Sequence, residues 1–150
     1  MKPFSLENRV DNLIEARVRA LPELSDADRY AEALAAAAGK FGSQAQAVLC
    51  ADHRPVGIYR QEVADRLAAL CAAMNTRLSR AAVLVSRSNA TLVMQLERLV
   101  REARNPSRRV FFSASDAVVF MASELTPAAQ ERARSFLAEW TPRPEDGPLR

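Results

Sequence analysis

Residues 80–112, RAAVLVSRSNATLVMQLERLVREARNPSRRVFF, decide the fold because they read as a strand, a helix and a second strand. The run at 81–86 is short, uncharged and partly β-branched. It stops at residue types that cap helices, which is typical of a strand that leads into a helix. Residues 92–103 then place apolar side chains along one helical face and charged side chains on the others. Pro106 ends this helix, because the residue before a proline is pushed out of the helical conformation.

The second strand of this unit, residues 110–112, predicts a parallel β-α-β crossover. It resumes with β-branched and aromatic residues about 25 positions after the first strand, which leaves room for a helix between two parallel strands. Apolar spacing, helix caps and chain breakers predict the other elements in the same way. These are a helix at 26–39, a strand at 45–51, a helix from about 59 to 78, a short helix at 113–125 and a last helix at 126–140.

The N-terminal segment, residues 4–18, fits two structures. Its apolar residues form a fair helical stripe, but residues 14–18 also alternate apolar with charged side chains, as a half-buried strand does. Asp11 and Asn12 offer a two-residue turn between two short runs. We therefore choose a β-hairpin over a helix.

The whole pattern predicts a single α/β domain over residues 1–140. Its sheet is expected to be mostly parallel, with four to five strands, right-handed crossovers, packed helices and the N-terminal hairpin. An all-α bundle is the alternative, because the helical patterns are strong and the strands are short. Residues 141–150 hold three prolines, a glycine and charges with little to bury, and this composition predicts a disordered tail.

Composition and charge narrow the classes of partner. The 150 residues are 49% hydrophobic and 26% charged, which is ordinary for one globular domain. The net charge of +3 comes from 21 basic and 18 acidic residues interspersed along the chain, whereas nucleic-acid binding needs a clustered basic surface. Lys2 and Lys40 are the only lysines, and this predominance of arginine is typical of a GC-rich bacterial genome. We expect no nucleic-acid partner.

The apolar runs of the chain are too short for a signal peptide or a membrane span. The start, MKPFSLENRV, has no apolar core, and the longest uncharged run, residues 41–51, is shorter than a bilayer requires. The sequence therefore predicts a cytoplasmic protein.

Cysteine and histidine usage gives no sign of a metal site or a cofactor. Cys50 falls in an expected buried strand and Cys71 on the apolar face of a helix, where reduced structural cysteines usually lie. The chain has one histidine and no CxxC pair, so a zinc site is not expected. It also has no glycine-rich phosphate loop, no GxSxG and no HExxH. We expect neither a cofactor nor catalytic activity.

A family resemblance rests on three stretches: VLCADHRP at 48–55 before a long helix, AAVLVSRSNATLVMQLERLVREA at 81–103, and RRVFF at 108–112 before a short helix. Their order resembles the STAS-like domains of sulfate transporters and anti-sigma-factor antagonists, over roughly residues 4–125. The resemblance implies a small non-catalytic switch that binds protein partners. Some members are controlled by phosphorylation of a serine or threonine at the start of the helix after the central strand. The corresponding stretch here, residues 52–61, has neither residue.

Three polar clusters follow the expected parallel strands, at residues 52–54, 86–89 and 113–116. Because the carboxyl ends of parallel strands share one edge of a sheet, we expect these clusters to be neighbours around a crevice. Ser88 and Asn89 are first of all helix caps, and His53 is not placed for catalysis with Asp52 because adjacent side chains on a strand point apart. The predicted partner- or anion-binding residues are Asp52, His53, Arg54, Tyr59, Arg60, Arg87, Ser88 and Asn89.

Two functions stay open. The first is a non-catalytic regulatory module that binds an acidic segment of a protein partner, or forms a homodimer, through the arginine-bearing loops after the strands. We favour it because it explains the absence of catalytic motifs. The alternative is a small-ligand or anion-binding protein, or an enzyme, with His53, Arg54 and Arg87 aimed into the strand-end crevice. Convergence of these three side chains on one spot would favour the alternative.

Overall fold

The computed structural model describes residues 2–42 and 44–141. In this part of the chain, five strands and five α-helices follow one another in the order expected from the sequence. Of the tail expected at 141–150, Thr141 alone belongs to the described residues, and the rest of that prediction lies outside them.

The elements are β1 (Phe4–Glu7), β2 (Leu13–Val18), α1 (Leu24–Gly39), β3 (Ala47–Asp52), α2 (Gln61–Ala73), η1, a 3₁₀ helix (Met74–Thr76), β4 (Leu78–Leu84), α3 (Ala90–Ala103), β5 (Arg108–Phe111), α4 (Ala114–Ala122) and α5 (Pro127–Ala138).

A five-stranded sheet forms the centre of the molecule, with the strand order β1-β2-β3-β4-β5. β1 and β2 are antiparallel, whereas the β2–β3, β3–β4 and β4–β5 pairs are parallel. The α/β prediction with an N-terminal hairpin is therefore confirmed, and the all-α alternative is wrong. The hairpin connection is longer than the two residues expected. It spans residues 8–12, with Asp11 in the left-handed conformation (φ 47°) and Asn8 donating hydrogen bonds to the carbonyls of Asp11 and Leu13.

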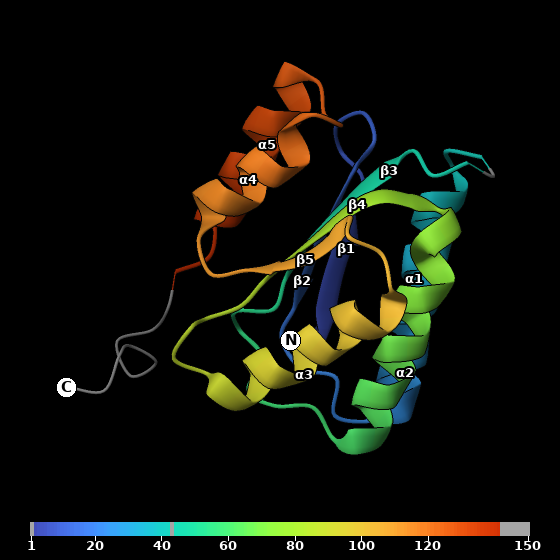
Figure 1. Ribbon diagram of the computed structural model, residues 1–150, viewed down its shortest axis with the longest axis vertical. Helices are drawn as coiled ribbons and strands as arrows, with labels where there is room; N and C mark the ends of the chain where they lie inside the picture. The colour runs from blue at the N-terminus through green and yellow to red at the C-terminus, as the bar shows by residue number, and fades with distance from the viewer. Residues whose placement is uncertain (1, 43, 142–150) are drawn as a thin grey trace.

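Helices cover the two faces of the sheet in separate layers (Figure 1). Because the strand order never reverses, each right-handed crossover moves the same way along the sheet, and α1, α2 and α3 come to lie on one face. α4 and α5 pack on the opposite face, against one side of β2, β3 and β4. A crevice at a reversal of strand order, as in a doubly wound sheet, is therefore not formed among the described strands. A hollow of about 520 Å³ does lie at the ends of β3 and β5, where Arg54, Ala114 and Ser115 line it together with Leu137 and Trp140, so the expected clusters at 52–54 and 113–116 are neighbours there.

The helix expected at 59–78 is shorter than its apolar spacing predicts. α2 ends at Ala73, η1 makes a tight turn, and β4 begins at Leu78. Leu70, Met74 and Leu78 are all buried in the same core, although they belong to three different elements. The apolar spacing continues across the turn for this reason, and it could not reveal where the helix stops.

The residues that cap the last two helices are the ones that the sequence predicts. The hydroxyls of Ser113 and Thr126 accept backbone hydrogen bonds at the starts of α4 and α5. α1, expected to begin at residue 26, starts earlier than predicted, at Leu24. Its N-cap is Glu23, whose backbone N–H donates to the carboxylate of Asp26 at 3.0 Å.

β2 is buried on both faces, which its alternating pattern does not reveal. Its apolar side faces α1–α3, while Glu15 and Arg17, on the other side, are 2% and 7% exposed. Glu15 accepts two hydrogen bonds from Arg132 of α5, at 2.7 and 2.9 Å. The charged side of β2 is thus covered by α5 and not by solvent. Its charges are paired because an unpaired buried charge is strongly unfavourable.

The two cysteines lie where the sequence predicted. Cys50 is buried in β3 and Cys71 is half-buried in α2, and both are free thiols. Burial raises the pKa of both thiols, so they stay protonated near neutral pH.

Leu96→Asp should unfold the domain. Leu96 is 1% exposed on the side of α3 that faces the sheet, so the substitution places a carboxylate in an apolar core and should cost more than about 3 kcal/mol. Met94→Asp is the matched control in the same helix, because Met94 is 73% exposed. Denaturant unfolding followed by circular dichroism should show a large loss of stability for the first variant and little change for the second. Equal stability of the two variants would contradict the assignment of this face to the core.

Candidate functional site

The predicted site residues at the end of β3 belong to the interior. Asp52 is fully buried, His53 is 4% exposed, and the side chain of Arg54 is 16% exposed. The sequence placed them in a polar loop because three polar residues follow an apolar strand. The end of α5 covers Arg54, whose guanidinium lies over the ring of Trp140 at 4.8 Å. The expectation that Arg54 is an exposed loop charge is therefore wrong.

Arg17, Asp52 and Arg54 form an ion cluster that joins β2, β3 and α5; we call it the Asp52 cluster. Arg17 donates from Nε to one carboxylate oxygen of Asp52 at 2.9 Å, and Arg54 donates from its own Nε to the other at 2.9 Å. The two arginines also donate to α5, Arg17 to the carbonyl of Phe136 (2.5 Å) and Arg54 to that of Leu137 (2.7 Å). Carbonyls in the last turn of a helix often lack intrahelical partners. The carbonyl of Phe136 also accepts from the N–H of Glu139 at 3.2 Å, and the cluster adds a second bond there and one to the carbonyl of Leu137. These bonds fix α5 to the sheet.

The charge of Asp52 is fully engaged inside this cluster. Burial by itself would raise its pKa, but hydrogen bonds from Arg54 and Arg17 outweigh burial, and the pKa lies below the ordinary value of an aspartate. Asp52 is therefore an anion shared between two guanidinium groups. We infer a structural role for it, because its carboxylate is already held by several donors.

His53 and Tyr59 form a buried pair on the side of the sheet that α1–α3 cover. The Nδ1 atom of His53 lies 2.8 Å from the hydroxyl of Tyr59. Gln95 of α3 holds the backbone of Tyr59 with two hydrogen bonds, at 3.1 and 2.8 Å. Burial lowers the pKa of His53 to about 4, against an opposing effect of Asp52, and raises the pKa of Tyr59. Both side chains are thus neutral at neutral pH and packed away from solvent.

Asn89 links the two loops that the sequence predicted to be neighbours. It is the N-cap of α3, and its side-chain oxygen accepts a hydrogen bond from the N–H of Leu92 at 3.2 Å. Its side-chain nitrogen donates to the carbonyls of Val56 and Gly57 in the loop after β3. The loops after β3 and β4 are therefore adjacent, and the capping role of Asn89 is confirmed.

Arg60 and Ser88 lie on the surface. Arg60 forms exposed ion pairs with Glu23 (3.5 Å) and Glu62 (3.8 Å). The hydroxyl of Ser88 lies 3.0 Å from that of Ser86. The cap of α3 is Asn89, so the predicted capping role of Ser88 is wrong.

His53, Arg54 and Arg87 do not converge on one spot. Within the described chain, no hydrogen bond or ion pair joins any two of them. His53 bonds a buried tyrosine, Arg54 bonds a buried aspartate, and Arg87 stacks on the ring of Phe112 at 4.2 Å. The arrangement that would favour a small-ligand site or an enzyme is therefore not the one that the fold produces.

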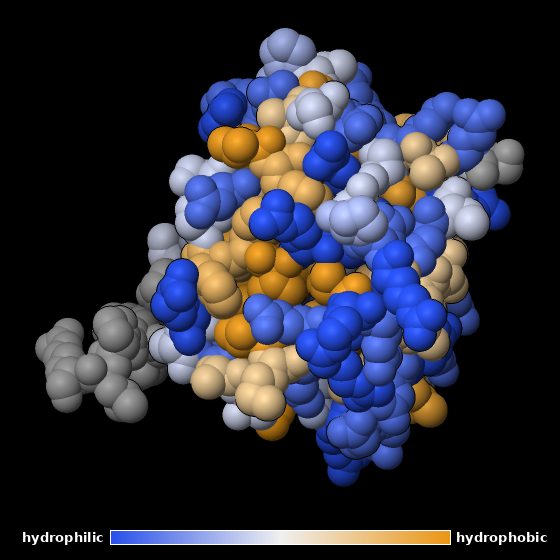
Figure 2. All heavy atoms as spheres, viewed as in Figure 1, coloured by the Kyte–Doolittle hydropathy of each residue, from blue (hydrophilic) through white to orange (hydrophobic). Residues whose placement is uncertain are grey.

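Arg87 belongs to an exposed surface along the last strand of the sheet. Its contact with Phe112 links the loop after β4 to the loop after β5. Arg109 of β5 lies over two further phenylalanines, 5.6 Å from each ring centre. Figure 2 shows an apolar strip here, between α4 and α3, with hydrophilic side chains around it. We call this surface the β5 edge; it consists of Arg87, Arg109, Val110, Phe111, Phe112 and Phe120.

The outer side of β5 has free backbone groups. No described strand pairs with that side of the sheet. The carbonyls of Ser107 and Phe111 accept hydrogen bonds from the N–H groups of Ala81 and Val85, at 2.9 and 3.0 Å. Because successive residues of a parallel strand turn their backbone groups to opposite sides, Val110 presents its N–H and C=O outward. An extended segment can add to such an edge.

The two guanidinium groups of the β5 edge carry uncompensated charge. Neither Arg87 nor Arg109 forms an ion pair with any carboxylate among residues 2–42 and 44–141, unlike Arg66, which pairs with Asp28 at 2.9 Å. Arg109, Phe111 and Phe120 are not among the site residues that the sequence predicts. The pattern at 108–112 predicts a strand, but it does not predict that this strand lies at the edge of the sheet. The signal was present in RRVFF, where charged and aromatic residues meet, but only the strand order shows that this strand is an edge.

Comparisons with protein-family models, curated proteins and solved structures found no match to this chain. Among the residues described, no three histidine, cysteine, aspartate or glutamate side chains group closely enough to hold a metal ion. In the same residues, no helix is both long enough and apolar enough to cross a bilayer. The assignment of a site therefore depends on the geometry of the chain itself.

Arg54→Met should destabilise the fold by about 3 kcal/mol, because it leaves the buried carboxylate of Asp52 with one guanidinium partner and removes a bond to α5. Arg60→Met is the matched control and should change stability little, since its ion pairs are exposed. Urea unfolding of both variants measures the difference. If Arg54→Met is as stable as Arg60→Met, the Asp52 cluster does not hold α5.

His53 should make stability fall as the pH drops below neutrality. Its pKa is about 4 in the folded protein and about 6.5 in the unfolded chain, so the unfolded chain takes up the proton first. This contribution is fully present above about pH 6.5 and is lost as the pH falls toward 4, by an amount on the order of 3 kcal/mol. His53→Gln should flatten this part of the profile, measured by urea unfolding between about pH 7 and about pH 4.5. Parallel profiles for the parent and the variant would show that His53 does not titrate in this window.

Proposed function

We propose that this chain is a non-catalytic regulatory module that binds an acidic, extended segment of a protein partner along the β5 edge. One observation carries the proposal. The same edge strand presents outward backbone groups at Val110 and the guanidinium groups of Arg109 and, beside Phe112, of Arg87, which have no carboxylate partner in the described chain. The proposal agrees with the resemblance to STAS-like domains, which act by binding proteins. We propose that family relationship as well.

The chemistry of this edge suits such a segment. A strand laid against β5 would bond to the backbone of Val110, and its alternate side chains would meet either solvent or the β5 edge. Carboxylates of the segment would accept charge-assisted hydrogen bonds from the two guanidinium groups. The phenylalanine ring beneath each guanidinium holds it in place and adds apolar area next to it. Backbone bonds would supply affinity, and the arginines would select acidic segments.

A homodimer through the same edge is less favourable. Pairing β5 with β5 of a second copy would join two edges that both carry Arg87 and Arg109, which have no carboxylate partner in the described chain. Like charges placed across a strand pair are destabilising. An acidic partner removes this repulsion, which is why we place a different protein at the edge.

Replacing Arg87 and Arg109 together by alanine should abolish partner binding and spare the fold, because both side chains are exposed. Arg29→Ala with Arg66→Ala is the matched control, since it removes the same charge from the outer surface of α1 and α2. Proteins that the immobilised full chain captures from cytoplasm of the source cells should be quantified for the parent and both double variants. If the partners of the parent persist with Arg87 and Arg109 gone but are lost with Arg29 and Arg66 gone, the helical face is the binding surface.

Val110→Pro tests strand addition itself. Proline removes the outward N–H of Val110, which is not part of the pairing with β4, so the sheet should stay intact. Loss of the half-buried valine side chain should lower the unfolding temperature by a few degrees at most. Val110→Thr keeps that N–H and is the control. We expect loss of the captured partners with proline and retention with threonine. Equal capture by the two variants, both folded, would mean that the partner does not bind as an added strand.

A further inference from the structure

Arg108, at the start of β5, is a buried cation that its protein partners do not neutralise. It is 2% exposed and lies between the sheet and the layer of α1–α3. It donates hydrogen bonds to the carbonyls of Leu78 (2.6 Å), Met74 (3.2 Å) and Ser107 (3.3 Å). These acceptors are neutral, and no carboxylate of the described residues forms an ion pair with it. Arg108 thus differs from Arg17 and Arg54, which share a buried aspartate.

One N–H donor of this guanidinium also lacks an acceptor. The Nε atom of Arg108 is buried and has no hydrogen-bond partner in the described chain. Burial lowers the pKa of Arg108 from its ordinary value, although an arginine stays protonated. A buried donor of a charged group without an acceptor is unfavourable, and natural structures usually supply one from the protein, from water or from a bound ion.

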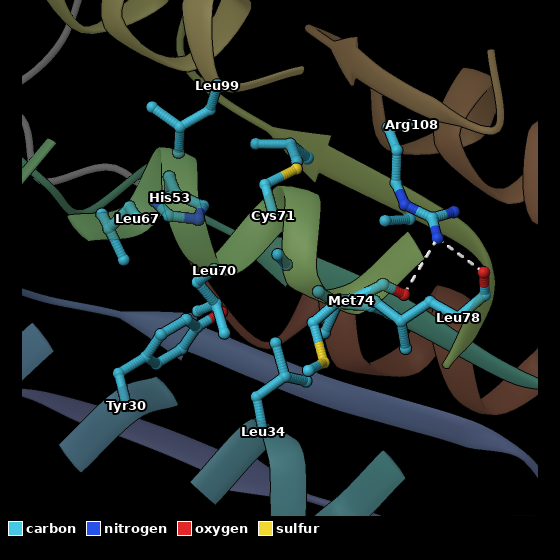
Figure 3. Close-up of a pocket in the computed structure, with 14 residues that line it drawn as sticks. Tyr30, Leu34, His53, Leu67, Leu70, Cys71, Met74, Leu78, Leu99 and Arg108 are labelled. Atoms are coloured by element: carbon cyan, nitrogen blue, oxygen red, sulfur yellow. Dashed lines mark hydrogen bonds between the residues drawn. The ribbon is translucent and has the colours of Figure 1, made fainter. Parts of the chain in front are cut away.

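The guanidinium lines an interior cavity of about 50 Å³. Figure 3 shows Arg108 on one side of this cavity and His53 on the other, with Cys71 between them. The remaining wall is almost entirely apolar and includes Leu34, Leu67, Leu70, Met74 and Leu99. Burial raises the pKa of Cys71, so its thiol is neutral and does not balance the charge of Arg108. The positive charge in this cavity therefore has no counterpart among the described side chains.

The size of the cavity limits what can enter it. A water molecule occupies roughly 30 Å³ in the liquid, and an apolar cavity of roughly 150 Å³ is needed to hold a benzene ring. A single ion fits here, whereas a ring or an alkyl chain does not. A water molecule could accept from the free Nε–H but would leave the positive charge of the guanidinium unbalanced, whereas an anion does both. A small anion is attracted by the charge itself, which acts strongly in a medium of low dielectric constant.

We infer that Arg108 heads a binding site for a small monovalent anion of halide size, for which chloride is the available ion in a cell. The anion accepts the free Nε–H, neutralises the guanidinium and fills the cavity beside Cys71. Arg108 also lines a surface groove of about 260 Å³ between α3 and β5, together with the exposed Arg101 and Arg109. The arginines of this groove outnumber its one carboxylate, Glu97, and raise the local concentration of anions next to Arg108.

Thermal unfolding of the full chain in sodium chloride, against sodium gluconate of equal ionic strength, tests this site. Chloride should raise the unfolding midpoint in a saturable way, by on the order of 3 °C at ten times its Kd, while gluconate, which is too large for the cavity, should not. Arg108→Met should remove the difference between the two salts. Arg60→Met removes an exposed arginine outside the β5 edge and should keep it. Equal midpoints of the parent chain in the two salts would overturn the inference.

Crystals of the parent chain grown with sodium bromide give a test that does not depend on a variant that folds. Bromide scatters anomalously and should appear in the cavity, within hydrogen-bond reach of the Nε atom of Arg108. A cavity that holds water, or nothing, at a bromide concentration that saturates surface sites would overturn the inference.

Discussion

The buried charge of Asp52 is the constraint on which the second helical layer depends. A carboxylate with no exposure to solvent is stable only if cations and donors surround it, and here two arginines from β2 and the loop after β3 do so. The same guanidinium groups reach the carbonyls at the end of α5. One cluster therefore balances a charge, satisfies a helix end and closes the apolar surface between α5 and the sheet.

This arrangement changes which charged groups are available at the surface. The charges of Asp52 and Arg54, at the end of β3, are paired with each other and with Arg17 inside the fold. The strand order β1-β2-β3-β4-β5 also has no reversal. Free charge and free backbone groups remain instead along β5, at the side of the sheet. Among the described residues, the outer side of β5 is where unpaired guanidinium groups and unpaired strand backbone occur together.

Arginine performs tasks in this fold that lysine would not. Arg132 holds Glu15 with two parallel hydrogen bonds, and Arg17 stacks on Phe136 while it bonds Asp52. Both uses depend on a planar group with donors in fixed directions. Arg108 differs from these arginines. Its guanidinium donates only to backbone carbonyls, and its Nε–H has no acceptor among the described residues.

The sequence by itself determined the order of the elements, because apolar periodicity, capping residues and prolines act over a few neighbouring positions. The strand-helix-strand unit at 80–112 and the caps at Asn89 and Thr126 followed from it. Only the tertiary structure decided that Glu15, Arg17 and Arg54 are buried and that β5 is an open edge. The alternation of a strand shows that its two faces differ, but not that a helix more than a hundred residues later covers the charged one. Exposure of β5 likewise depends on strand order, which arises from packing between distant segments and leaves no local pattern in the chain.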